Sequence, residues 1–349
     1  MSYTLSEKAA RLIPYEPITG DYRVRLDANE SFLPVPDEAL EALHRALDTT
    51  ALQRYPDPMA AGVCSRFAAY YGVDPALVTA GNGSDELISV IVNTFLQKGE
   101  RAMVLSPDFS MYSFYLSLAE AECVTLDKGM DFTIDVSQVL DGLRRSGSRM
   151  LLFSNPCNPT GQGLPREQVL EIVRGTDALV VLDEAYMDFW DDAQSLVRDT
   201  AGYDNLIVLR TCSKMMGLAA LRLGFAVACE PLTRVLRAAK SPYNVNTLTQ
   251  LAAQAVLSYP DALRRGKREI LQSKAGLEAM AASLPLREGE AFLPTCTNFL
   301  VLRTPRARAL FEALCQRSII VRCFSGFLRI TVGNEEENKA LIGALREIL

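Results

Sequence analysis

Histidine and tryptophan are nearly absent from the sequence: each occurs once in 349 residues. The single histidine, His44, lies in the stretch Asp37–Asp48, where Leu40, Leu43 and Leu47 recur at helical spacing. We therefore expect His44 on the solvated side of a helix. A histidine-based metal site and a serine–histidine catalytic pair are excluded, and no metal is predicted.

Further absences limit the location and the partners of the protein. The eight cysteines form no C-x-x-C pair, and the first eleven residues lack the apolar core of a signal peptide. No apolar run approaches membrane-spanning length. A net charge of −6 and a pI near 5.2 give no general affinity for nucleic acid or for an anionic membrane. We expect a soluble, cytoplasmic protein with reduced thiols.

The chain is long enough for two lobes, since 49% of its 349 residues are hydrophobic. Residues 1–36 carry four prolines and little apolar periodicity, which predicts an arm that lies over a lobe or over a partner subunit. Residues 37–245 alternate strands with helices, and residues 246–349 change to longer helices with a few strands. We therefore predict an arm, a large domain and a small α+β C-terminal domain.

Apolar runs that alternate with helical patterns make this an α/β protein with a mostly parallel sheet, covered by helices on both faces. In such a sheet, ligands bind at the carboxyl ends of the strands. The predicted strands of the large domain begin near Val78 and then follow at Arg101–Leu105, Ala121–Leu126, Met150–Ser154, Ala178–Asp183, Leu206–Leu209 and Phe225–Ala228.

The strongest signal of function surrounds Lys214. Leu206–Leu209 is an apolar run typical of a buried strand, and a polar turn that contains the lysine follows it. Desolvation at such a point favours the neutral amine, which attacks an aldehyde to form an imine. The hydroxyls of Thr211 and Ser213 and the guanidinium of Arg222 can hold a phosphate beside it. The pattern indicates a phosphorylated aldehyde cofactor; a solvated lysine in a surface loop is the simpler alternative.

A second element directed at phosphate is the run Gly81-Asn-Gly-Ser-Asp-Glu86. Its glycines make a sharp turn out of a short strand, and Ser84 or Asp85 then begins a helix whose first amide groups are free. Such a helix terminus binds phosphate through its backbone. An ordinary capped helix is the alternative, because the run lacks the third glycine of the dinucleotide-binding fingerprint.

Polar residues at two neighbouring strand ends complete the constellation. Asp183 ends an apolar strand, so a buried carboxylate there needs a cationic or hydrogen-bonding partner, such as a protonated pyridine nitrogen. Asn158 and Tyr186 can both donate to a phenolate oxygen, and Phe109 can stack on an aromatic ring. Taken singly, these residues have structural alternatives: a helix cap, an Asx turn, a packed tyrosine and a core phenylalanine.

Several motifs stand in an order typical of one enzyme family. The main motifs are Gly81-Asn-Gly-Ser-Asp85, Asn155-Pro-Cys-Asn-Pro-Thr-Gly161, Asp183-Glu-Ala-Tyr186, Ser213-Lys214 and Arg222. Supporting stretches are Leu12-Ile-Pro-Tyr15, Leu26-Asp-Ala-Asn-Glu30, Arg54-Tyr-Pro56, Pro107-Asp-Phe-Ser-Met-Tyr112 and Leu328-Arg-Ile-Thr-Val-Gly333. Over essentially its whole length the chain resembles the pyridoxal-phosphate-dependent class II aminotransferases of fold type I. Within that family it is most similar to the histidinol-phosphate aminotransferases.

The resemblance implies a large domain with a mostly parallel seven-stranded sheet that binds pyridoxal 5′-phosphate. By the resemblance, Lys214 bonds the cofactor aldehyde and then moves a proton between substrate and cofactor, while Asp183 keeps the pyridine nitrogen protonated. The other implied contacts are Asn158 and Tyr186 with the ring oxygen, Phe109 with the ring face, Gly83, Ser84, Asp85, Thr211, Ser213 and Arg222 with the phosphate, and Tyr55 from the other subunit of a homodimer.

On the substrate side, the resemblance implies that Arg329 anchors an acidic group, with Tyr15 and Arg322 close by. Two features depart from the family pattern: Phe109 stands where tyrosine is usual, and the segment between the two arginines is short. The implied reaction transfers the amino group of L-histidinol phosphate to 2-oxoglutarate in histidine biosynthesis. A threonine-phosphate decarboxylase or an aromatic amino-acid aminotransferase of the same fold is the alternative, because both share the cofactor residues.

A cofactor-sensing regulator of transcription is a hypothesis from another class of protein. Such a regulator needs a basic DNA-binding module, and the sequence has neither the extra length nor a basic face for one. An enzyme is therefore the prediction.

Overall fold

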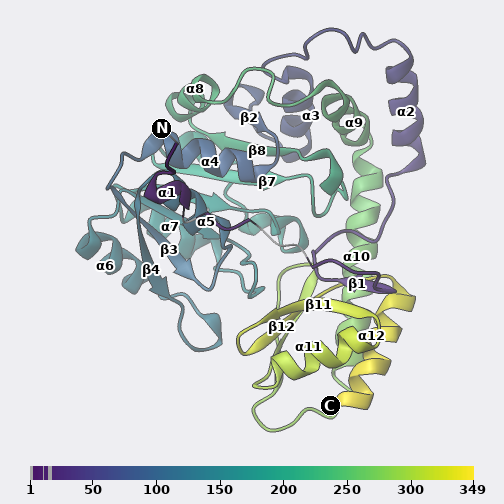
Figure 1. Cartoon of the computed structure of the whole chain (residues 1–349). Coiled ribbons are helices and arrows are strands. Elements are labelled where there is room, and N and C mark those ends of the chain that lie inside the picture. The colour runs from purple at the N-terminus through teal and green to yellow at the C-terminus, as the bar shows by residue number, and fades with distance from the viewer. Residues whose placement is uncertain (1–2, 11, 15–17) are drawn as a thin grey trace.

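Two sheets of unequal size organise the protein, which the computed structural model describes at residues 3–10, 12–14 and 18–349. Figure 1 shows the larger sheet and its helices at the upper left and the smaller sheet at the lower right. The long helix α10 (Pro260–Ala281) runs along the side of the molecule from one to the other. The α/β architecture predicted from the sequence is confirmed.

The larger sheet has seven strands in the order β2-β8-β7-β6-β5-β3-β4. The pairs β3–β4, β3–β5, β5–β6 and β6–β7 are parallel, and the two pairs that involve β8 are antiparallel, so the sheet is mostly parallel as predicted. The strands are β2 (Val78–Gly81), β3 (Arg101–Ser106), β4 (Glu122–Asp127), β5 (Met150–Ser154), β6 (Leu179–Asp183), β7 (Leu206–Thr211) and β8 (Gly224–Ala228).

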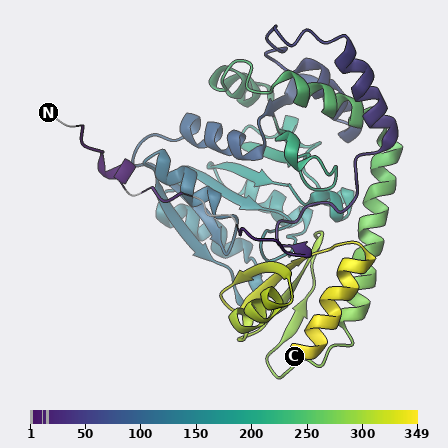
Figure 2. The ribbon, with the colours of Figure 1, turned by 45° about the vertical axis from the view of Figure 1, so that its right-hand side comes forward.

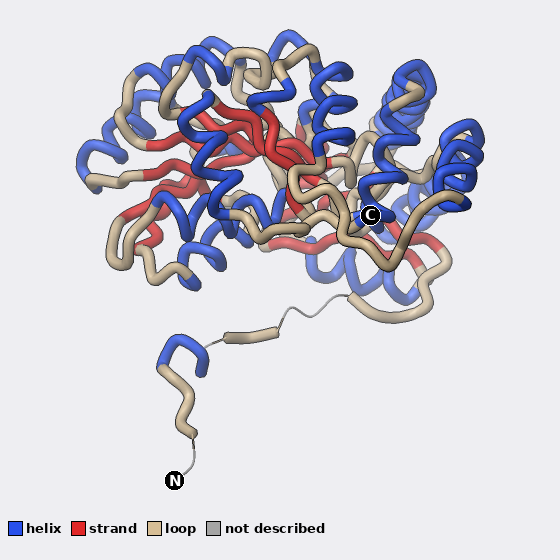
Figure 3. The backbone as a smooth tube through the Cα atoms, turned by 90° about the horizontal axis from the view of Figure 1, so that it is seen from above, coloured by secondary structure: helices blue, strands red, loops and turns tan. Residues whose placement is uncertain are grey.

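Helices cover both faces of this sheet, which explains why its central strands are continuous apolar runs (Figure 3). Along β5, Met150 and Leu152 pack on one face and Leu151 and Phe153 on the other, because successive side chains of a strand point to opposite sides. The first face is covered by α4 (Ser84–Phe95), α5 (Met111–Leu118) and α8 (Glu230–Ala239), and the second by α3 (Ala61–Tyr71), α6 (Val136–Ser146), α7 (Arg166–Arg174) and α9 (Thr247–Leu257).

Two N-terminal helices lie outside these layers. α1 (Glu7–Ala10) lies at the edge of the body of the molecule in Figure 2. The Nζ of its Lys8 donates to the carbonyl of Leu118 (2.9 Å). α2 (Asp37–Asp48) packs against α9 and buries only Ala39, and its His44 is exposed as predicted. No helix in the described ranges has both the length and the apolar character that crossing a membrane requires.

The smaller sheet has five strands in the order β1-β11-β12-β10-β9. β1 (Val24–Leu26) comes from the N-terminal segment and pairs in parallel with β11. It was not predicted, because three residues are too few to show an alternation. The domain boundaries predicted after residues 36 and 245 stay a prediction. The other elements are β9 (Ala291–Leu293), β10 (Phe299–Arg303), α11 (Ala307–Gln316), β11 (Ile319–Phe324), β12 (Phe327–Thr331) and α12 (Glu335–Ile348).

Gly224, the first residue of β8, lets the sheet approach the start of α4 closely. A side chain at this position would place its Cβ 2.4 Å from the backbone nitrogen of Ser84 and 2.7 Å from the carbonyl carbon of Gly83. Both neighbours are backbone atoms that cannot rotate away. The glycine therefore sets the position of the α4 N-terminus beside the end of β7, whose Thr211 pairs with Gly224.

We expect Gly224→Ala to lower the free energy of unfolding by about 1–3 kcal/mol, because β8 and α4 must separate to admit the methyl group. Gly343→Ala is the matched control, since a Cβ at Gly343 within α12 meets no atom within 4 Å. That control should gain about 0.5–1 kcal/mol from better helix propensity. Urea unfolding measures both, and a Gly224→Ala protein as stable as wild type would contradict the close approach.

Candidate active site

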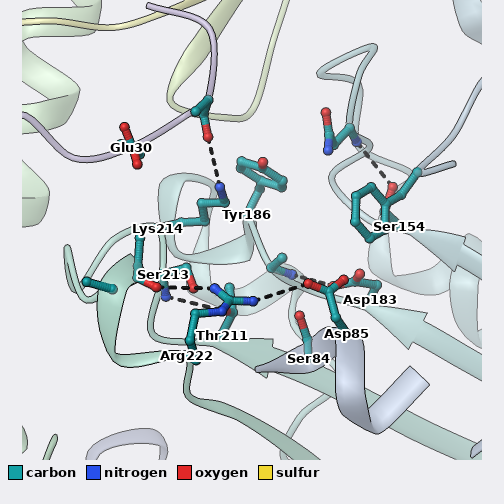
Figure 4. Close-up of a pocket in the computed structure, with 16 residues that line it drawn as sticks. Glu30, Ser84, Asp85, Ser154, Asp183, Tyr186, Thr211, Ser213, Lys214 and Arg222 are labelled. Carbon is teal, nitrogen blue, oxygen red and sulfur yellow. Dashed lines mark hydrogen bonds and ion pairs between the residues drawn. The ribbon is translucent and has the colours of Figure 1, made fainter. Parts of the chain in front are cut away.

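The carboxyl ends of β5, β6 and β7 meet the start of α4 at a cavity of about 400 Å³. Parallel strands end at one edge of a sheet, so the side chains that follow them converge there. Asn158 follows β5, Asp183 and Tyr186 stand at the end of β6 and in the turn after it, and Lys214 follows β7. Figure 4 shows Asp183, Tyr186 and Lys214 around one space, with the start of α4 beside them.

Asp183 is the last residue of β6, and the alternation along the strand turns it to the same face as Val181, toward α4 and α5. Only 5% of the residue is exposed. The Tyr112 hydroxyl donates to Oδ2 (3.0 Å) and the Ala185 amide donates to Oδ1 (3.0 Å). Burial raises the pKa of Asp183 to about 7 against the lowering effect of these donors. Neither partner is a cation, so a positively charged group would stabilise the ionised carboxylate further.

Lys214 lies three residues beyond β7 in the wall of the same cavity. β7 is buried along its whole length, as the apolar run predicts, but the lysine is only half-buried, which is less desolvation than expected. Its Nζ donates to the carbonyl of Ala28 (3.1 Å) and lies 5.7 Å from the centre of the Tyr186 ring. Within the described part of the chain, the amine is thus oriented by one hydrogen bond at the cavity surface.

One end of the cavity is rich in hydrogen-bond donors. α4 begins directly after Gly83, whose φ of 87° suits glycine, and the first amide groups of a helix have no partner within it. The Arg222 guanidinium reaches this end and pairs with Asp85 (3.3 Å). Thr211 and Ser213 also line the cavity, and the Ser213 amide donates to the Thr211 hydroxyl (3.1 Å). Together these groups can bind an anion such as phosphate.

Asn158 and Tyr186 connect the larger sheet to the N-terminal segment and to the smaller sheet. The buried Tyr186 hydroxyl accepts from the side-chain amide of Asn29 (2.8 Å). The side-chain oxygen of Asn158 accepts from the Arg329 guanidinium, which also donates to the carbonyl of Asp27. These bonds fix the orientation of both side chains at the border between the two sheets.

A second cavity of about 700 Å³ adjoins the first, and Lys214 lines both. Arg322 and Arg329 line the second cavity from neighbouring strands, directly opposite each other in the β11–β12 register. Only Ser325 and Gly326, with φ of 83° at the glycine, turn the chain between the strands. The short segment noted in the sequence is therefore a tight hairpin, which sets the two arginine side chains on one face of the sheet.

Comparison with known proteins identifies the family. Residues 23–345 match the family described as aminotransferase class I and II. The chain belongs to this family. The histidinol-phosphate aminotransferase of Clostridium kluyveri is 36% identical over 345 residues, which cover 97% of each chain. That of Thermococcus gammatolerans is 36% identical over 348 residues, which cover 99% of this chain and 97% of the relative.

A crystal structure supports the same fold for this aminotransferase. The histidinol-phosphate aminotransferase from Sinorhizobium meliloti, in complex with pyridoxal-5′-phosphate, superposes with a TM-score of 0.88 at 24% identity. The match covers 99% of this chain and 97% of the other. The fold class expected from the sequence is therefore confirmed at the level of the whole chain.

Most residues predicted for the site of this aminotransferase line the two cavities. Gly83 does not line either cavity, but a Cβ at this position would come 3.0 Å from the Arg222 guanidinium, which lines the first cavity. Tyr55 lies outside both cavities: it is 81% exposed and stacks on Tyr243, with ring centres 4.6 Å apart. Tyr15 is outside the described residues. The residues that do line the cavities are Ser84, Asp85, Phe109, Asn158, Asp183, Tyr186, Thr211, Ser213, Lys214, Arg222, Arg322 and Arg329.

The structure adds residues that the sequence analysis did not assign to the site. Ser154 ends β5 and lines the first cavity, a position that its place at the end of an apolar run could have indicated. Tyr112 binds Asp183 and Asn29 binds Tyr186. Both lie in stretches that carry the family resemblance, but neither is at the end of a predicted strand, so no pattern pointed to its contact.

We expect Asp183→Asn to change how the stability of the ligand-free protein depends on pH. The pKa of Asp183 is about 7 in the folded protein, and an unfolded aspartate has a pKa of about 4. Between these values the folded state binds more protons, so the unfolding free energy of wild type should fall by a few kcal/mol as pH rises. Asp183→Asn should lack this fall. Urea unfolding near pH 5 and near pH 8 tests it; equal pH dependence in both proteins would contradict the raised pKa.

Proposed function

We propose that this aminotransferase transfers the amino group of L-histidinol phosphate to 2-oxoglutarate, giving imidazole-acetol phosphate and L-glutamate, in histidine biosynthesis. The observation that carries the proposal is the name shared by relatives that are 36% identical over nearly the whole chain. The cofactor is pyridoxal 5′-phosphate, as in this enzyme family. The relatives do not favour threonine-phosphate decarboxylase or aromatic amino-acid aminotransferase activity, although both remain consistent with the cofactor residues.

The chemistry of the first cavity fits this cofactor. Asp183 offers a buried carboxylate whose hydrogen-bond partners carry no charge, which suits a protonated pyridine nitrogen. The start of α4 and Arg222 offer donors to a phosphate, and Lys214 presents a primary amine to the same space. When bound, the cofactor supplies an aldehyde that takes up amino groups and a ring that withdraws electrons from the substrate α-carbon.

We assign covalent attachment and proton transfer to Lys214. With the cofactor bound, Lys214 would hold its aldehyde group through Nζ, and the same amine would move a proton to and from the substrate α-carbon. Its half-buried position supports this role, because the amine lines the cavity and its hydrogen bond to the Ala28 carbonyl orients it there. Asp183 would keep a proton on the pyridine nitrogen of the bound cofactor.

The remaining residues of the first cavity are proposed to orient the cofactor. Asn158 and Tyr186 hydrogen-bond the ring oxygen, and Phe109 covers the face of the ring; all three line the cavity. The phosphate group is bound by the backbone of Gly83, Ser84 and Asp85 and by the side chains of Thr211, Ser213 and Arg222.

Arg322 and Arg329 are proposed to bind the acidic group of the substrate in the second cavity. Arg329 is 7% exposed and its guanidinium is oriented by Asn158 and by the carbonyl of Asp27. Arg322 stands opposite it in the hairpin. The two positive charges on one face of the smaller sheet suit an anionic substrate. Tyr15 completes this proposal on the family resemblance alone.

We also propose a cytoplasmic homodimer in which Tyr55 of one subunit reaches the cofactor phosphate of the other. Tyr55 is 81% exposed and lines neither cavity of its own chain, and its sequence neighbours Leu52 and Met59 are 65% and 40% exposed. Exposed apolar side chains around an aromatic residue are typical of a subunit interface. The arm (1–36), the large domain (37–245) and the small domain (246–349) belong to the same proposal.

A half-reaction screen tests the substrate. Mixing the cofactor-loaded protein with L-histidinol phosphate or L-glutamate should convert the visible absorption band rapidly, whereas L-phenylalanine and L-threonine phosphate should react more slowly. Lys214→Ala should show neither the band nor turnover, with an unchanged far-UV circular dichroism spectrum, because the variant lacks the attacking amine. Retained turnover in Lys214→Ala would contradict its role. Faster reaction with phenylalanine, or carbon dioxide released from threonine phosphate, would indicate one of the alternative activities.

Mixing two impaired variants tests the shared site. Protomers with Tyr55→Phe and protomers with Lys214→Ala should, when refolded or exchanged together, form mixed dimers with one fully intact site, if Tyr55 acts across the interface. Activity should then rise several-fold above the average of the separate variants. Size-exclusion chromatography at the same concentration gives the oligomeric state as the control. Activity that only averages the two variants would place Tyr55 outside the partner's site.

A further inference from the structure

Tyr112 is the one side chain that hydrogen-bonds the Asp183 carboxylate among the residues that the structure describes. Its hydroxyl donates to Oδ2 at 3.0 Å, and the residue is 1% exposed. It stands on α5, on the face of the sheet to which the alternation along β6 turns Asp183. The other carboxylate oxygen, Oδ1, accepts from the backbone amide of Ala185. Each oxygen is therefore held by one donor.

We propose that Tyr112 is a positioning residue for the reaction: its hydroxyl holds the Asp183 carboxylate in the orientation that meets the cofactor ring nitrogen. The inference rests on the proposed function, because it takes pyridoxal 5′-phosphate as the ligand of Asp183. Tyr112 itself is not a lining residue of either cavity. It acts through Asp183.

The packing around Tyr112 fixes its hydroxyl in place. The ring belongs to the hydrophobic core formed by α4, α5 and the sheet. The edge of the ring also meets Phe109, with ring centres 5.6 Å apart at 84°. Phe109 lines the first cavity, so one buried tyrosine supports both the carboxylate and the side chain proposed to cover the cofactor ring.

The charges around Asp183 explain why an uncharged donor matters there. Asp108 and Asp85 oppose ionisation of Asp183, as burial does, and the donors Tyr112 and Ala185 favour it. On the cavity side, the other titratable residues that line the same space are Glu30, Asp85, Tyr186, Lys214 and Arg222. Without the Tyr112 hydroxyl, the carboxylate keeps only the Ala185 amide as a donor, which leaves Oδ2 unrestrained.

The test compares two cofactors on the cofactor-free protein. Tyr112→Phe removes only the hydroxyl. Equilibrium dialysis should show that it weakens binding of pyridoxal 5′-phosphate about tenfold or more. An analogue with a C–H group in place of the ring nitrogen cannot pair with Asp183, so its affinity should be unchanged. Because misfolded protein would lower the binding of both compounds equally, the ratio of the two affinities reports on the contact alone.

Tyr71→Phe is the matched control. The Tyr71 hydroxyl also donates to a buried carboxylate, Asp188 at 3.0 Å, but it belongs to the core on the opposite face of the larger sheet. This control should leave the affinity ratio as in wild type. In an Asp183→Asn background, adding Tyr112→Phe should not change the ratio further, because the contact has already been altered.

Two results would overturn the role of Tyr112. The first is an unchanged affinity ratio in Tyr112→Phe, whether both affinities stay the same or both fall equally, and the second is a further change of the ratio in the Asp183→Asn background. A wild-type protein that binds neither compound would instead contradict the proposed cofactor. If Tyr112→Phe does not fold, Tyr112→His replaces it, because histidine keeps a ring with a hydrogen-bond donor. The affinity ratio of Tyr112→His is then compared with that of Asp183→Asn. Tyr112→His should then retain more discrimination between the cofactors than Asp183→Asn, and equal discrimination would contradict the proposal.

Discussion

A carboxylate removed from water at the end of β6 is the constraint on which the cavity depends. A buried charge of this kind is tolerated only where donors or a cation stabilise it, and the fold supplies two donors to Asp183 while leaving one side open to the cavity. The parallel order of β5, β6 and β7 brings the amine of Lys214 to the same edge. One edge of the sheet therefore brings together a carboxylate, an amine and a site for an anion.

Strand ends were the part of the site that could be predicted from the sequence. The apolar runs before Asp183 and Lys214 are long enough to read as buried strands, and in a parallel sheet their ends converge whatever the loops do. The turn at Gly83 could be predicted for a similar local reason: a positive φ favours glycine, and α4 begins at the next residue. These local rules determined most of the first cavity.

Contacts between distant segments could not be predicted from the residues themselves. β1 is too short to show a pattern, and its pairing with β11 joins residues about three hundred apart in the chain. The bond between Tyr112 and Asp183 depends on the way α5 packs on the sheet, which no spacing in the sequence encodes. Tyr55 and the arginine pair at 322 and 329 were named from the resemblance, and the hairpin geometry that aligns the arginines appears only in the structure.

The attachment of β1 has a mechanical meaning for the enzyme. β1 is hydrogen-bonded into the smaller sheet, while Ala28 and Asn29, which follow it, bind Lys214 and Tyr186 of the larger one. This short connecting peptide therefore couples the position of the smaller sheet to two side chains of the larger one. A shift of β1 relative to the larger sheet would therefore strain one hydrogen bond to each of these side chains, from Lys214 to Ala28 and from Asn29 to Tyr186.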